Sequence, residues 1–423
     1  SLDVRIRDNR LEDSATHGLA LRGNFIQQVD IHRNLIRGAQ GNGISFDGGD
    51  VGPIVANLTI SHNDIMGCVG RNAVPTALPF GGIVLGRMIE LEIRDNRITD
   101  NGGDGRAAVC GVYVHRSFGA EVSRNLISNN GRPADGGAPL PGRQAGVYLA
   151  GAQIGIGSTP DPGVPGGLVL TVGNVPAARI VGNDIDSPRG HALAIIGAGP
   201  MAVEGNRLQC HDILREPGAA GGGTPLQNML NWVGTVAIVN FGLPSWFYAF
   251  LLGAGFSGAP GWGAISITGF SLPNSQIGGH IQFRGNQVRL DLSQTHAELA
   301  LANMLIISLD DVQVADNQSE GVLRANPAGL GGLGPGPGGG FDFLMADLAA
   351  FAITLRQADN GFMTTPYLTA FSIMSGAVVN HCLGNQTTSC INAVGGAPKS
   401  KRMNNAILFP HPLFCKDAGL GFD

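Results

Sequence analysis

Residues Leu91 to Ile98 read LEIRDNRI, and this stretch decides the fold. Two apolar residues stand one position apart, Asn96 follows, and an apolar residue closes the pattern at Ile98. The same eight-residue pattern recurs along the chain, most often at intervals of about 23 to 33 residues. A repeat of that length is typical of a solenoid. The asparagines of the copies are Asn9, Asn34, Asn63, Asn96, Asn125, Asn183, Asn206, Asn286 and Asn317, the last copy ending on serine.

The spacing of the apolar residues predicts a strand, because successive side chains of a strand point to opposite faces. We expect the asparagine to end the strand, since asparagine tolerates the left-handed conformation better than most residues. A second apolar strand is predicted in many gaps, at 18–21, 43–46, 82–85, 111–114 and 146–149. Each repeat therefore forms a coil of at least two strands, and stacked coils would let the asparagine side chains hydrogen-bond in a ladder.

This pattern resembles the generic parallel β-helix repeats of the pectate-lyase-like superfamily, over residues 1–210 and 280–320. The resemblance implies an all-β fold, a right-handed parallel β-helix solenoid with an irregular, apolar C-terminal portion. A leucine-rich repeat has a denser leucine pattern, which this chain lacks. Coils of the β-helix type occur in lyases, hydrolases, epimerases, phage tailspikes and adhesins, so the repeat does not define an activity.

The distribution of the repeats predicts the domain organisation. We expect one β-helix over residues 1–325, with an uncharged insertion at about 217–280. A Gly/Pro-rich loop at 326–340, divergent last coils at 341–398 and a tail or cap at 399–423 would follow. Asn380 is expected to occupy the ladder position of a last coil, and residues 153–176 are expected to conceal one further irregular coil.

Composition limits the partners of the chain. The net charge is −5 and there is no basic block, which argues against nucleic acid as a partner. The six cysteines form no CxxC pair, which argues against zinc, whereas Cys382 and Cys390 could form a disulfide. The chain begins within the repeat, so we expect it to be part of a longer protein or a trimmed product. The N-terminus does not give the compartment, and an extracellular or surface-associated location is favoured.

Residues 217–283 contain no Asp, Glu, Lys or Arg, and 228–256 are strongly apolar. One interpretation is a set of buried strands with a short apolar insertion. A second is an exposed loop at Trp246, Phe247 and Tyr248 that binds another protein or a second copy of the chain. Membrane insertion is disfavoured, because Asn, Pro and Ser interrupt the run that a transmembrane helix needs.

The outward strand position holds the candidate catalytic residues. Glu92 and Glu121 occupy it in consecutive repeats, and equivalent residues of stacked strands lie about 4.8 Å apart. Retaining glycosidases use two carboxyl groups at a separation of about 5 Å, so a catalytic pair is one interpretation. A cation site, with calcium as the ion, is another. Neutralisation by Arg94, Arg97 and Arg124, nearby in the sequence, would instead make this an ordinary solvated face.

Other motifs of the resembled superfamily are incomplete. Its lyases bind calcium with clustered aspartates, but here Asp64 and Asp184 alternate with arginines on separate repeats. Its polygalacturonase-like hydrolases would place Asp-Asp between Asn183-Asp184 and Gly190-His191, and Arg-Ile-Lys after them; both are absent. We therefore interpret His17 and His191, which precede equivalent strands, as residues that cap turns.

The leading hypothesis is a non-enzymatic, rigid scaffold or surface-recognition module of a larger protein or assembly, with glycan as a candidate ligand. The alternative is a polysaccharide lyase or glycoside hydrolase. Its groove would lie near Glu92, Glu121 and the loops at 101–108 and 131–143. No resident metal or cofactor is expected for the scaffold, and calcium is kept open for the enzyme.

Overall fold

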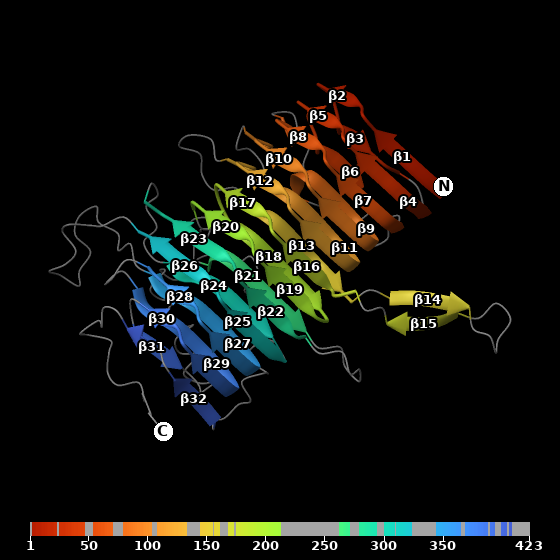
Figure 1. Cartoon of the computed structure of the whole chain (residues 1–423). Helices are drawn as coiled ribbons and strands as arrows, with labels where there is room; N and C mark the ends of the chain where they lie inside the picture. Colours follow the sequence, from red (N-terminus) through yellow and green to blue (C-terminus); the bar gives the residue numbers. More distant parts are fainter. Residues whose placement is uncertain are drawn as a thin grey trace, which may run out of the picture.

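The computed structural model is a parallel β-helix, elongated along the direction in which its coils stack (Figure 1). The structure describes residues 2–22, 25–46, 54–70, 79–103, 108–132, 144–154, 156–160, 168–172, 175–212, 262–270, 279–293, 300–308, 310–323, 344–364, 369–387, 390–393, 399–403 and 406–407. Each coil passes through three faces, named here the first, second and third. The chain begins on the second face with β1 and then passes through the third, the first and the second face in each turn. The first and second faces share one bent 19-stranded sheet, and the third is a separate 12-stranded sheet.

Three groups of strands build the larger sheet. The first face contains β3 (Leu19–Ala20), β6 (Ile44–Phe46), β13 (Ala145–Gln153), β18 (His191–Ala198), β21 (Trp262–Phe270), β24 (Ala300–Ser308) and β31 (Cys390–Ala393). The second contains β1 (Leu2–Arg7), β4 (Phe25–His32), β7 (Ile54–Ser61), β16 (Ala178–Val181), β19 (Met201–Glu204), β22 (Ile281–Arg284), β25 (Asp311–Ala315) and β32 (Lys399–Met403). Four long strands run through both faces: β9 (Phe80–Arg94), β11 (Val109–Ser123), β27 (Leu344–Ala358) and β29 (Thr369–Leu383).

The third face contributes one short strand per coil. Its members are β2 (Arg10–Glu12), β5 (Leu35–Arg37), β8 (Asp64–Met66), β10 (Arg97–Thr99), β12 (Leu126–Ser128), β17 (Asp184–Ser187), β20 (Arg207–Cys210), β23 (Gln287–Asp291), β26 (Gln318–Val322), β28 (Gly361–Phe362), β30 (Gln386–Thr387) and β33 (Ala406–Ile407). The prediction of a right-handed all-β solenoid is thereby confirmed in its parallel stacking, and the strands expected in the gaps between repeats are present.

The core is built from apolar rows that run along the stacking direction. Ile60 pairs in register with Ile93, and Ile93 with Val122, and all three are fully buried. On the third face, Ile65, Ile98 and Ile127 form the opposing row. Each coil buries too little apolar surface to be stable alone, so the stacking of neighbours supplies the stability.

The asparagine ladder runs from Asn9 through the described coils to Asn385. At its centre, the Asn96 side-chain amide donates to Asn125 Oδ1 at 3.0 Å and to the carbonyl of Ile60 at 2.8 Å. Its Oδ1 accepts from the backbone N–H and the side-chain amide of Asn63, at 2.9 and 3.0 Å. The amide is therefore saturated although it is buried, as buried polar groups must be.

Two details of the ladder differ from the prediction. The left-handed residue is the one before each asparagine, for example Asp95 with φ 56° and Arg124 with φ 53°. That residue makes the turn, which leaves the asparagine free to point inward. The ladder position of the last coils belongs to Asn360 and Asn385, not to Asn380. Asn380 pairs with Leu355 in an inward position of the second face, within β29.

A row of glycines makes the corner between the third and first faces. A Cβ at Gly82 would overlap Cγ2 of Ile98 and lie 3.0 Å from the carbonyl oxygen of Gly111. Gly18, Gly43, Gly111 and Gly146 are crowded in the same way by the isoleucines of the third face. The absence of a side chain at this corner lets the two faces close tightly on the core.

The same corner row becomes polar toward the C-terminus. The register carries the row from Ala264 to Asn303, Asp347 and Ser372, all fully buried. Asp347 accepts a hydrogen bond from the Thr364 hydroxyl at Oδ1, while its Oδ2 has no partner among the described residues. Burial raises the pKa of Asp347 to about 8, and the Thr364 bond opposes the rise. The carboxyl group is therefore mostly protonated at neutral pH.

The long interval between Asn125 and Asn183 contains no extra coil, so that prediction is wrong. Asn125 donates directly to Asn183 Oδ1 at 3.0 Å, and β11 pairs with β16. The interval instead holds an antiparallel hairpin of β14 (Ile156–Pro160) and β15 (Leu168–Val172), which projects from the side of the helix (Figure 1).

The C-terminal segments continue the same sheets. β21 begins at Trp262 and pairs with β18, and β32 pairs with β29. Cys390 lies beside Phe371 on the first face, while Cys382 lies beside Arg402 on the second. A disulfide needs Cα atoms within about 7 Å, and the separation along β29 is too long for the predicted Cys382–Cys390 bridge.

Candidate functional site

An exposed surface of polar side chains lies on the second face in the N-terminal half of the β-helix. Its central row is formed by side chains that point outward from consecutive coils. The register places in this row Arg5, Asp30, Thr59, Glu92, Glu121 and Arg179. The outward row that was predicted from the repeat is therefore one continuous line of neighbouring side chains.

Glu92 and Glu121 are direct partners in this row, on β9 and β11. Arg94 Nε lies 2.8 Å from a carboxylate oxygen of Glu92, and an Arg179 nitrogen lies 2.8 Å from one of Glu121. The Thr59 hydroxyl donates to the second oxygen of Glu92 at 3.5 Å. Each carboxylate is thus ion-paired with an arginine on the surface.

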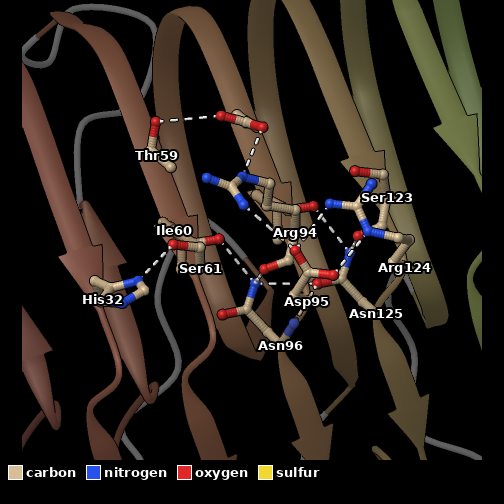
Figure 2. A network of polar contacts seen from close by, with 12 residues as sticks. His32, Thr59, Ile60, Ser61, Arg94, Asp95, Asn96, Ser123, Arg124 and Asn125 are labelled. Atoms are coloured by element: carbon tan, nitrogen blue, oxygen red, sulfur yellow. Dashed lines mark hydrogen bonds and ion pairs between the residues drawn. The ribbon is translucent and has the colours of Figure 1, made fainter.

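The arginines beside this row form a network with the turn residues (Figure 2). Arg124 donates two hydrogen bonds of 2.8 Å to the carboxylate of Asp95, and Arg94 lies 3.4 Å from the same group. The bonds from Arg124 hold the pKa of Asp95 below its usual value, against the opposing effect of burial. Arg94 therefore bridges Glu92 and Asp95, and Arg124 serves Asp95 rather than either candidate glutamate.

A groove of about 570 Å³ lies at the N-terminal end of the second face. Arg5, Arg7, Asp30, His32 and Arg94 are among the residues that line it. Arg7 pairs with Asp30, and Arg5 with Asp3 at 2.9 Å. His32 Nδ1 lies 3.0 Å from the Ser61 hydroxyl. The groove therefore offers donors and acceptors with little net charge, which suits a hydroxyl-rich ligand.

Sequence reasoning did not single out Arg7 or His32 for this groove. Both lie two residues beyond the central row, at Arg7 on β1 and His32 on β4, and so face the same side. The register Arg7–His32–Ser61–Arg94–Ser123 forms a second outward row beside the first. The alternation of the repeat was the signal that could have found them.

The remaining candidate residues are dispersed. Arg97 pairs with Asp64 at 3.5 Å and Arg207 with Asp184 at 3.4 Å, both on the third face. His17 Nδ1 accepts the backbone N–H of Asn42 at 3.0 Å, which caps a turn as predicted. His191 is fully buried, its Nδ1 lies 2.8 Å from the carbonyl of Gly263, and burial lowers its pKa. It begins β18 and its ring contacts the neighbouring strand β21, so the prediction that it caps a turn is wrong.

Several predicted features lie outside the described residues: Trp246, Phe247 and Tyr248, the 228–256 segment, and the loops at 104–107 and 133–143. Among the residues that the structure describes, no group of three or more His, Cys, Asp or Glu side chains could hold a metal ion. The described part of the chain also contains no helix that is long and apolar enough to cross a membrane.

The comparisons with known proteins agree with the fold. Residues 3–158 match a family model described as the right handed beta helix region. No curated protein and no solved structure matches the chain. Taken with the parallel stacking of the coils, the match shows that the resemblance to right-handed parallel β-helices is correct. The family match identifies the fold and gives no information on an activity.

Proposed function

We propose that this chain is a non-enzymatic, rigid β-helix scaffold that recognises glycan through its exposed polar surface, as a module of a larger protein or assembly. Calcium and other cofactors have no part in this proposal. An extracellular or surface-associated location fits a glycan ligand.

The observation that carries the proposal is the pairing of the two candidate carboxylates. Arg94 Nε lies 2.8 Å from Glu92 in an ion pair without a hydrogen bond, and Arg179 donates a hydrogen bond of 2.8 Å to Glu121. A glycosidase needs one carboxyl group that delivers a proton and another that attacks or activates water. Here each group is ion-paired with an arginine at the surface, and the described contacts assign neither of them the role of acid or of nucleophile.

The rigidity of the surface supports the same conclusion. The outward rows are fixed by strands whose inward rows are buried and whose turns are held by the asparagine ladder. A recognition surface gains affinity when its groups are held in place before the ligand arrives. The second face meets this condition over several consecutive coils.

The test is a turnover screen on acidic and neutral polysaccharides, with and without Ca²⁺. Wild type is compared with the Glu92→Gln, Glu121→Gln double variant, and with Glu12→Gln as a matched control, because Glu12 is ion-paired with Arg10 on the third face and lines neither groove. We expect no turnover by any of the three proteins, and binding of at least one glycan by wild type. Turnover by wild type that is lost in the double variant and kept in Glu12→Gln would overturn the scaffold proposal.

The second candidate function is a polysaccharide lyase or glycoside hydrolase. The observation in its favour is the register of Glu92 with Glu121 on adjacent strands, because this spacing is close to the separation of about 5 Å in retaining glycosidases. In that case Arg94 and Arg179 would bind an acidic substrate rather than neutralise the glutamates, and Ca²⁺ dependence would appear in the same screen.

Attachment to a larger assembly is a separate part of the proposal. The uncharged sequence at 228–256, with Trp246, Phe247 and Tyr248, is the proposed contact with a protein partner or a second copy. A Trp246→Ala, Phe247→Ala, Tyr248→Ala variant should sediment as a smaller species than wild type if self-association uses these side chains. Identical sedimentation of two associated proteins would refute this role.

A further inference from the structure

A second surface changes its chemistry along the β-helix. On the third face, the residues that directly follow the ladder asparagines point outward and form one row. In the N-terminal coils this row contains both charged and apolar side chains. In register, its first members are Arg10, Leu35, Asp64, Arg97, Leu126, Asp184 and Arg207. From the next coil onward the row reads Gln287, Gln318, Gly361 and Gln386, and it ends at Ala406. Ion-paired charges thus give way to uncharged amides in the C-terminal coils.

The amide row coincides with a groove of about 760 Å³. Gly361 leaves one side chain missing between Gln318 and Gln386, which opens the row at its centre. Met363, 36% exposed, lies beside this gap. The volume lies within the range of about 300–1,000 Å³ that is usual for sites of small ligands.

The arginines at this groove are engaged with carboxylates. Arg207 lies 3.4 Å from Asp184, and Arg289 lies 3.2 Å from Asp291 and 3.3 Å from Glu320. Asp359 adds a further carboxylate to the lining. An anionic ligand would therefore displace existing ion pairs and meet negative charge, so the groove disfavours acidic sugars.

We propose that this groove binds a neutral oligosaccharide. The proposal rests on the proposed function in glycan recognition and adds to the second-face surface a separate site on the third face, with its own ligand class. Glutamine amides each present donors and an acceptor, which match the hydroxyl groups of a sugar. The gap at Gly361 admits a sugar ring, and Met363 offers an apolar surface to the C–H face of that ring. The glutamines orient the ligand without a charge that would have to be desolvated.

The decisive variant fills the gap and leaves the backbone unstrained. At Gly361 an added Cβ would meet only Met363, at 3.4 Å, which is an ordinary contact. Gly361→Gln should therefore restore the row and close the groove while the protein stays folded. Leu126→Gln is the matched control, because Leu126 occupies the same row, is 41% exposed and lies five coils away. Circular dichroism of both variants should equal that of wild type.

Binding is measured by isothermal titration calorimetry with cellohexaose, mannohexaose and laminarihexaose, and with hexagalacturonate as the acidic counterpart. We expect wild type and Leu126→Gln to bind at least one neutral hexasaccharide, at least tenfold more tightly than hexagalacturonate. Gly361→Gln should bind it at least tenfold more weakly than wild type.

Three outcomes would overturn the proposal. Neutral-glycan binding that Gly361→Gln retains would place recognition elsewhere and leave the proposed function standing. A preference for hexagalacturonate would refute the ligand class and again leave glycan recognition intact. Failure of folded wild type to bind any of the four sugars would refute the site, and failure in the wider polysaccharide screen as well would refute glycan recognition itself.

Discussion

Removal of the Asn96 side chain should destabilise the protein far more than removal of the side chain at the end of the same ladder. In Asn96→Ala, the backbone N–H and side-chain amide of Asn63 lose their acceptor, at present 2.9 and 3.0 Å away. The Ile60 carbonyl and Asn125 Oδ1 lose a donor, at 2.8 and 3.0 Å. The Asn63 side-chain amide keeps its bond to the Ile31 carbonyl, whereas its backbone N–H keeps none that the structure describes.

The magnitude follows from these groups. A buried donor left without a partner costs about 1–3 kcal/mol, and an ordinary lost hydrogen bond about 0.5–1.5 kcal/mol. The Arg94 carbonyl also loses its bond of 3.0 Å from the Asn96 amide, so one orphaned donor and four weakened groups give a loss of roughly 5 kcal/mol in the free energy of unfolding. Asn9→Ala is the matched control: Asn9 donates to Asn34 and Arg7, and in the described coils no residue before it relies on its oxygen. Its loss should be below about 1 kcal/mol.

The assay is urea unfolding followed by far-UV circular dichroism, with hydrogen exchange of a peptide spanning residues 58–66 as the local measurement. Asn96→Ala should lower the unfolding free energy and speed exchange at Asn63, while Asn9→Ala should leave that peptide protected. If the two variants differ by less than about 1 kcal/mol, the reasoning that buried ladder amides hold the coils together is wrong.

Three further predictions test the core and the corners. Relative to wild type, Asp347→Asn should become increasingly stable as pH rises from 4 to 8. Below the unfolded pKa of about 4, the Asp347 carboxyl group holds its proton in both the folded and the unfolded state. Above that pH the unfolded wild-type chain ionises, whereas the folded protein, with a pKa of about 8, does not, so wild type loses stability that the variant keeps. The gain should be on the order of 4 kcal/mol at pH 7 and close to zero at pH 4, and a gain that does not change across this range of thermal-unfolding measurements would refute it. Gly82→Ala should cost about 1–3 kcal/mol because its Cβ overlaps Ile98, whereas Gly103→Ala, with no atom within 4 Å of the new Cβ, should unfold like wild type in urea. Burial raises the pKa of Cys68 to about 11 and that of Cys210 to about 12, so peptide mass spectrometry should show slow iodoacetamide labelling of both at pH 8 until urea unfolds the chain; rapid labelling in the native state would contradict this burial.

The repeat was sufficient to predict the stacking, the inward rows and the neighbourhood of Glu92 and Glu121, because one strand register propagates through every coil that keeps the pattern. The repeat did not predict that the corner glycines form a row packed against the isoleucines of the third face. Each of these contacts joins a glycine and an isoleucine on different faces, and the eight-residue pattern does not relate the two positions. It also missed a second short ladder, in which Asn101 donates to Asn130 Oδ1 at 2.8 Å. Those two asparagines follow the third-face strand, outside the eight-residue pattern.

The end of the solenoid was harder to predict because its inward positions are polar. Asn380 and Gln357 stand where earlier coils have apolar residues, so the pattern that marks a strand is broken there. Asn380 was therefore predicted as a ladder residue, whereas Asn360 and Asn385, which form the ladder in these coils, were not. The groove at Gly361 was not predicted from the sequence for a related reason. The absence of a side chain at Gly361 opens a gap only because the register places this residue between Gln318 and Gln386.

The pairing of charges on the second face likewise depended on the register. Arg179 reaches Glu121 from a coil 58 residues later in the sequence, which only the direct stacking of β11 on β16 explains. An additional coil in that interval, as the sequence suggested, would have separated the two.

The most direct test of the central claim is one proton NMR experiment on wild type with a mixture of neutral and acidic oligosaccharides, with and without Ca²⁺. We predict saturation transfer from the protein to at least one glycan, and anomeric signals that stay unchanged for a day. New reducing ends or signals of unsaturated sugars, lost in the Glu92→Gln, Glu121→Gln variant, would contradict it and make the chain an enzyme.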